Sequence, residues 1–328
     1  MRRIDRTCLA TMKSPVRHLM QDAIPNSIFA IAPERQAQFG ISLDNYDLIY
    51  TGDRKWTFCA YPQRTPPEVW VSRGAVELLW CASLAHFLFY TRLIQGKKFD
   101  KPTVIDPHSD KEVDNALKLL AWAINCQLQD DQLDDWPALL PQPIASPARF
   151  SNENVADELC LVSAAFLLHH ELAHIRGNHV GFTKEQLRDP ANRLLSLAQE
   201  KEADIAAAEW VLDGVAEGDP KFVKRMLGIV QGFLLTTAMG LYGGNLGGES
   251  HPFNHDRLAS LLNRFLGNTP HLTKGIAFAV LDLHFQNSGR TMQKTNFPGP
   301  EEALNALCDQ LAGEAHEREN AINAQTGN

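Results

Sequence analysis

One stretch of the chain constrains the fold more than any other, the run FLLHHELAHIRGNH at residues 166–179. The overlapping segment LCLVSAAFLL, at 159–168, is apolar almost all round a helix, so it predicts a helix that is packed on every side. Buried polar groups cost free energy unless they are paired, yet this helix ends in three histidines and a glutamate. The sequence therefore predicts a polar site that is built on a core helix.

The spacing of these polar residues predicts a metal site. His170 and His174 are four residues apart, so both imidazoles lie on one face of the helix and reach one ion. Glu171 lies about 100° around the helix axis. Together they form HExxH, in which two neutral imidazoles ligate Zn²⁺ at about 2.0–2.1 Å and the carboxylate activates water. Gly177 is expected to cap the end of this helix.

A catalytic zinc site of this kind needs a third protein ligand, which we expect downstream. The pattern HExxHxxGxxH does not supply it, because His179 comes one residue too early. In AQEKEADIAAAEW, Glu200 and Asp204 share one helix face, whereas Glu202 points roughly the opposite way. We expect Glu200 to be the third ligand and Asp204 to accept the Nδ1–H of His170. Taken alone, this segment also fits a solvated charged stripe.

The rest of the chain indicates an α+β fold in which helix predominates. Short β-branched and aromatic runs between turn residues predict a small antiparallel sheet at about 41–72. The Pro-rich stretch 139–150 reads as a loop, so residues 1–328 are expected to form a single domain. Ser109 is the expected N-cap of the second helix. Helices are expected at 74–94, 110–128, 153–176, 192–213, 221–242, 254–266, 272–286 and 301–322.

Composition narrows the partners and the compartment. The chain carries 31 basic and 39 acidic residues with no basic stripe, so nucleic acid is not an expected partner. Six cysteines without a CxxC pair favour reduced thiols in the cytoplasm, and the N-terminus lacks the apolar run of a signal peptide. Segments 74–94 and 227–244 approach the roughly 20 apolar residues of a membrane span. Their polar residues favour buried helices over membrane contact.

HExxH followed by ExxAD on a second helix resembles the gluzincin metallopeptidases. Among these, the chain resembles the soluble peptidases related to the phage-exclusion protein Lit more than the CAAX-prenyl and heat-shock membrane families, which carry clear transmembrane helices. The doubled LHHELAHI supports this choice, and the likeness covers roughly residues 155–260. The resemblance implies a zincin-like core and a zinc endopeptidase that cleaves a host protein, with translation elongation factor Tu as the substrate class and phage exclusion as the role.

A third segment, ESHPFNHDRLASLL at 249–262, resembles the HP...R region that follows the third ligand in several gluzincin families. A tetrahedral intermediate needs a donor or cation opposite the metal. His251 is the first candidate, with Tyr242 and Arg257 behind it. An N-capping turn is an equal alternative for His251, and a structural role is the leading expectation for His255 and Tyr242.

The expected reaction is amide hydrolysis, in which Glu171 takes a proton from water and passes it to the leaving amine. An extended substrate is expected to pair with the edge strand EVWVS at 68–72. His169 is expected to be a hydrogen-bonded core residue, and His179 to support the site without ligating the metal. The alternative is a zinc-binding regulatory module without proteolysis. Glu171 favours an enzyme, and a latent peptidase that awaits a peptide or protein activator fits equally well.

Overall fold

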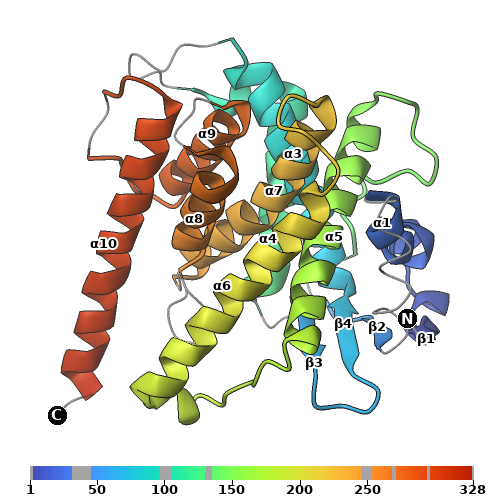
Figure 1. Cartoon of the computed structure of the whole chain (residues 1–328). Coiled ribbons are helices and arrows are strands. Elements are labelled where there is room, and N and C mark those ends of the chain that lie inside the picture. Colours follow the sequence, from blue (N-terminus) through green and yellow to red (C-terminus); the bar gives the residue numbers. More distant parts are fainter. Residues whose placement is uncertain are drawn as a thin grey trace. The chain divides into compact units, whose positions relative to one another are not determined.

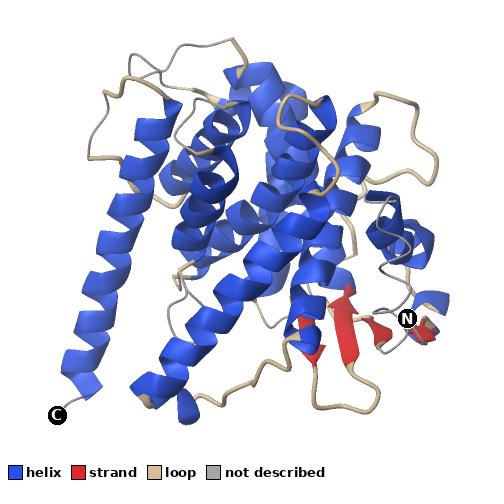
Figure 2. Cartoon of the chain, viewed as in Figure 1, coloured by secondary structure: helices blue, strands red, loops and turns tan. Residues whose placement is uncertain are grey.

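The computed structural model describes residues 3–31, 46–96, 105–129, 135–244, 253–267, 271–293 and 296–326. Helix predominates and the strands are few, which confirms the predicted α+β class (Figure 2). The strands are β1 (Arg3–Asp5), β2 (Asp47–Thr51), β3 (Phe58–Tyr61) and β4 (Glu68–Ser72). The α-helices are α1 (Ile24–Ile31), α3 (Arg73–Phe89), α4 (Lys111–Leu128), α5 (Asn152–Arg176), α6 (Pro190–Leu212), α7 (Pro220–Gly243), α8 (Asn254–Leu266), α9 (Leu272–Asn287) and α10 (Pro300–Thr326).

The predicted helices agree with the observed ones to within a few residues at each end. The first of them continues past α3 as a π-helical turn, Tyr90–Ile94. The N-cap of α4 was predicted wrongly. Asp110, not Ser109, is the capping residue, because its carboxylate accepts hydrogen bonds from the backbone N–H groups of Glu112 and Val113. Helix α1 and strand β1 were not predicted.

The sheet is mixed, so the prediction of an antiparallel sheet was only partly right. Its strand order is β1-β2-β4-β3, and only the β3–β4 hairpin is antiparallel. Strand β2 pairs in parallel with both β1 and β4. The prediction that EVWVS is an edge strand was wrong, because this segment is β4 and lies between β2 and β3. Its alternate side chains Val69 and Val71 are fully buried, so one face of β4 is packed in the core.

The core around the HExxH helix is built by close helix packing. Helix α5 packs against α3, and Trp80 Nε1 of α3 donates a hydrogen bond of 2.6 Å to Asp157 of α5. Helix α7 approaches α5 at Gly228, where Ser163 Oγ donates to the Gly228 carbonyl over 2.8 Å. A Cβ at position 228 would lie 2.3 Å from a methyl carbon of Val162. The middle of α5 is therefore packed against its neighbours, as its apolar sequence predicts.

The contacts divide the chain into two compact units. The second unit includes α8, α9 and α10, and α10 packs against both of the others (Figure 1). The single domain expected from the sequence stays a prediction. The first unit comprises Met1–Leu93, Pro107–Gly181 and Glu202–Gly232, and the second comprises Ile94–Asp106, Phe182–Lys201 and Phe233–Asn328.

Two helical segments of the described chain are long and apolar enough to cross a membrane, Arg73–Ile94 and Pro220–Gly243. In their most apolar stretches, 83% and 72% of the residues are buried inside the structure. This burial is typical of core helices in a soluble protein and agrees with the expectation for these segments.

One buried histidine in α3 predicts how stability depends on pH. His86 Nδ1 lies 2.9 Å from Gln231 Oε1, and burial lowers the His86 pKa from 6.5 to about 4. Between these two values the unfolded chain binds a proton that the folded chain does not. The free energy of unfolding should therefore fall as the pH drops from about 6.5 to about 4, by up to about 1.4 kcal/mol per pH unit.

His86→Gln should flatten this acid dependence, which urea unfolding at a series of pH values would measure. His108→Gln removes a surface histidine, 70% exposed and 2.6 Å from Asp114, and should keep the loss of stability between pH 6.5 and about 4 that comes from His86. Equal slopes for the parent and His86→Gln would contradict the assignment.

Candidate metal centre

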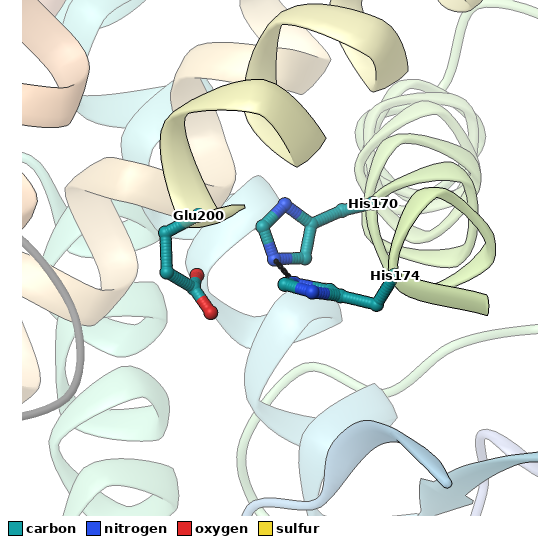
Figure 3. A group of neighbouring side chains, drawn as sticks. All are labelled: His170, His174 and Glu200. Carbon is teal, nitrogen blue, oxygen red and sulfur yellow. Dashed lines mark hydrogen bonds between the residues drawn. The ribbon is translucent and has the colours of Figure 1, made fainter. Parts of the chain in front are cut away.

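The last turns of α5 place the two motif histidines side by side, with a nitrogen of each ring directed at the other. His170 is buried and His174 is half-buried. Their Nε2 atoms lie 3.1 Å apart, and their rings meet at 74° (Figure 3). Two nitrogens on one tetrahedral zinc ion, each at about 2.0–2.1 Å from it, lie about 3.3 Å apart. The pair thus has the spacing that a shared metal ion requires.

Helix α6 contributes two buried carboxylates, one helical turn apart. Glu200 is the first, and its oxygen forms with the imidazole nitrogens of His170 and His174 a group whose members all lie within 4.8 Å of one another (Figure 3). Asp204 is the second, and its Oδ1 lies 3.0 Å from Nδ1 of His170. The shared face predicted from the four-residue spacing thus holds for both carboxylates.

The structure separates the two glutamates of EKEAD as helix geometry predicts. The Glu202 side chain is 73% exposed, and its carboxylate lies 3.6 Å from Nε2 of His179. His179 in turn places Nδ1 2.9 Å from Nδ1 of His174. Glu202 thus lies beside His179, outside the group formed by Glu200 and the histidine pair.

The donor set fits a divalent metal ion. With its Nδ1 directed at Asp204, His170 presents Nε2 toward the other two donors. Two imidazoles and one carboxylate are the ligands of many catalytic zinc sites. Buried carboxylates also need compensating positive charge, and the Arg257 guanidinium lies 3.5 Å from Glu200.

The carboxylate of Glu171 is held against the sheet. It is buried, and its Oε2 accepts a hydrogen bond of 2.6 Å from the backbone N–H of Ala60 in β3. The amide of Ala60 therefore points away from β4, to the side of β3 on which none of the described strands pairs. Sequence reasoning missed this contact, because a backbone amide leaves no signal in the amino-acid sequence.

Four further residues are candidates from the sequence, and three of them lie in the described part of the chain. His169 is buried and stacks on Trp210 with parallel rings 5.5 Å apart, as expected of a core residue. Tyr242 contacts His284 through its hydroxyl, 3.0 Å from the ring nitrogen. His255 is fully buried and stacks on Phe253, in line with the structural role expected for it. His251 lies outside the described residues, so its role as an oxyanion donor stays a prediction.

Comparison with known proteins assigns the family. Residues 69–273, which are more than half of the chain, match the Peptidase U49 family. The chain is also 26% identical over 282 residues to the Cell death peptidase of Escherichia coli strain K12, covering 84% of this chain and 90% of that protein. No solved structure matches the chain.

The chain therefore belongs to the Peptidase U49 family, which supports a peptidase activity. This confirms the resemblance to the Lit-type peptidases stated from the motifs. The matched region contains α5 and α6, and with them His170, Glu171, His174, Glu200 and Asp204, whereas Ala60 of β3 lies before it.

The geometry of α6 predicts different effects for its three acidic residues. Glu200→Ala should abolish tight metal binding because it removes a ligand. Asp204→Ala should weaken metal affinity by about 10–100-fold because it frees the ring of His170. Glu202→Ala should retain the affinity of the parent and is the matched control on the same helix.

Competition with a chromophoric chelator, run on the three variants side by side, measures these affinities. A silent Glu200→Ala together with a damaging Glu202→Ala would show that the ExxxD register is misread.

Proposed function

We propose that the chain is a zinc-dependent endopeptidase of the gluzincin type with a zincin-like core. The observation that carries this proposal is the buried group of His170, His174 and Glu200 beside Glu171. The membership of a peptidase family supports the reaction class, and the two-histidine, one-carboxylate donor set supports zinc.

The roles of the residues follow from their positions. Bound zinc supplies a Lewis acid that polarises the scissile carbonyl and acidifies water. Glu171 accepts a proton from the attacking water and delivers it to the leaving amine. Asp204 fixes the tautomer of His170, so that the Nε2 lone pair faces the metal. Arg257 holds Glu200 in place by charge, and His251 remains the proposed donor to the developing oxyanion.

An extended peptide would bind along the open edge of β3. Backbone pairing with an edge strand gives affinity without demanding a particular sequence, which suits an endopeptidase. In this structure the N–H of Ala60, which points to that edge, donates a hydrogen bond to the Glu171 carboxylate. A substrate strand that takes over this amide would release the Glu171 carboxylate for proton transfer. Substrate binding and activation of the base are thereby coupled.

The biological setting is proposed from the family likeness. We propose a cytoplasmic enzyme that cleaves a host protein, of which translation elongation factor Tu is the candidate, in phage exclusion. The relative from Escherichia coli is called a cell death peptidase, a name that suits an activity damaging to the host cell. Neither nucleic acid nor a membrane is a proposed partner.

A second function is favoured by one specific contact. The hydrogen bond from the Ala60 N–H occupies one oxygen of the Glu171 carboxylate, which is the proposed base. This arrangement suits a latent peptidase that is switched on by a peptide or protein activator, or a zinc-binding regulatory module that never cleaves. Proteolysis assays with and without candidate activator proteins separate these alternatives. A latent peptidase cleaves only when its activator is present, and a regulatory module does not cleave in either case.

The first prediction from this proposal is a metal content of about one zinc per chain. Elemental analysis of the purified protein, and of protein refilled after chelation, measures it. Protein that neither contains zinc nor takes it up would contradict the proposal.

The second prediction concerns the base. Glu171→Gln should keep the metal and the fold but lose proteolysis, because the nearly isosteric amide cannot accept a proton. Gel-based detection of cleaved host proteins, with zinc analysis of the same samples, tests it. Cleavage at the rate of the parent would show that Glu171 is not the base.

A further inference from the structure

Helix α5 ends in a turn that brings the chain back onto its own last turn. Asn178 is in the left-handed region, with φ of +49°. Its N–H donates to the carbonyl of Ile175 over 3.3 Å, and the N–H of His179 donates to the carbonyl of His174 over 3.0 Å. These two bonds define a Schellman motif. In this motif the residue after the left-handed one, here His179, lies against the residue five positions before it, here His174.

In most Schellman motifs that contact is apolar, but here two imidazoles make it. Nδ1 of His179 lies 2.9 Å from Nδ1 of His174, and the rings meet at 79°. His179 is 9% exposed. Its other nitrogen, Nε2, lies 3.6 Å from the exposed carboxylate of Glu202. The turn thus lays a buried imidazole on the side of His174 that faces away from His170.

Gly177 provides the space for this ring. It has φ of −74°, so it is not needed for an unusual backbone conformation. A Cβ at position 177 would lie 2.4 Å from Nε2 of His179. Any side chain at that position would push the ring away from His174.

We propose that His179 is a positioning residue for His174, and this proposal rests on the proposed metal site. The Nδ1–H of His174 donates to Nδ1 of His179, which leaves the Nε2 lone pair of His174 directed at the metal. Nε2–H of His179 points toward Glu202. Metal-binding histidines generally need such a partner on their other nitrogen. Asp204 serves His170 in this way, and the imidazole of His179 serves His174.

The two groups that position the metal-site histidines differ in kind, because one is a carboxylate and the other is an imidazole. Asp204 is an anion and is buried beside His170. An imidazole nitrogen as acceptor fixes the tautomer of His174 without adding another buried carboxylate to the site. Glu202 lies 3.6 Å from the other nitrogen of His179 and is exposed, so solvent screens its charge and its loss should leave the His179–His174 contact in place.

The test separates this role from a merely structural cap. His179→Leu keeps an apolar Schellman contact but removes the acceptor, and zinc affinity should fall by about 10–100-fold. His179→Asn places an amide oxygen near the position of Nδ1, and affinity should return close to that of the parent. Thermal unfolding of the metal-free variants, measured alongside chelator competition, reports on the cap itself.

Two further variants guard against a folding defect at position 179. Gly177→Ala favours helix over glycine but displaces the ring, so it should weaken zinc binding without lowering the unfolding temperature of metal-free protein. Asn178→Gly is the matched control, because glycine adopts a positive φ readily and leaves His179 in place. Its zinc affinity should equal that of the parent.

The outcomes decide between the two proposals. A parent that binds zinc, with weak binding only in His179→Leu and Gly177→Ala, supports the role of His179. Tight binding by His179→Leu, or binding by His179→Asn as weak as that of His179→Leu, overturns it and leaves the proposed enzyme intact. A parent that binds no zinc overturns the proposed function, and the role of His179 with it.

Discussion

The burial of polar side chains at the end of an apolar helix is the constraint on which the site depends. Helix α5 carries His170 and Glu171 into the core, where an unpaired polar group costs about 1–3 kcal/mol. Each polar residue finds a partner on a different part of the fold. Asp204 comes from α6, the Ala60 amide from β3, and His179 from the turn that ends α5. The same contacts that make burial tolerable also fix the direction of each donor.

The local part of this site could be predicted because helix geometry is local. A separation of four residues puts His170 with His174, and Glu200 with Asp204, whatever the rest of the chain does. Strand pairing is not local, so the sequence could not predict that β2 joins β4 in parallel. The edge strand that would pair with an extended substrate was therefore predicted at 68–72, which is an inner strand of the sheet.

At the end of α5, the sequence predicted the right residue as the end of the helix but for the wrong physical reason. Gly177 was expected as the capping glycine, and it does end the helix. The left-handed position is taken by Asn178, a residue type that also tolerates positive φ. What selects glycine at 177 is the ring of His179 packed against it. That requirement follows from a contact two residues away, which the usual pattern of helix caps does not include.

Charge leads to the same assignment as geometry. Glu171, Glu200 and Asp204 are each less than a tenth exposed, so three carboxylates are buried on two helices. The Ala60 amide donates to Glu171, the Arg257 guanidinium lies beside Glu200, and the His170 ring lies beside Asp204. Three buried carboxylates are costly, and positive charge beside them lowers that cost. A divalent ion between His170, His174 and Glu200 would add positive charge at the place where the donor atoms converge. The folded state and the bound metal should therefore stabilise each other.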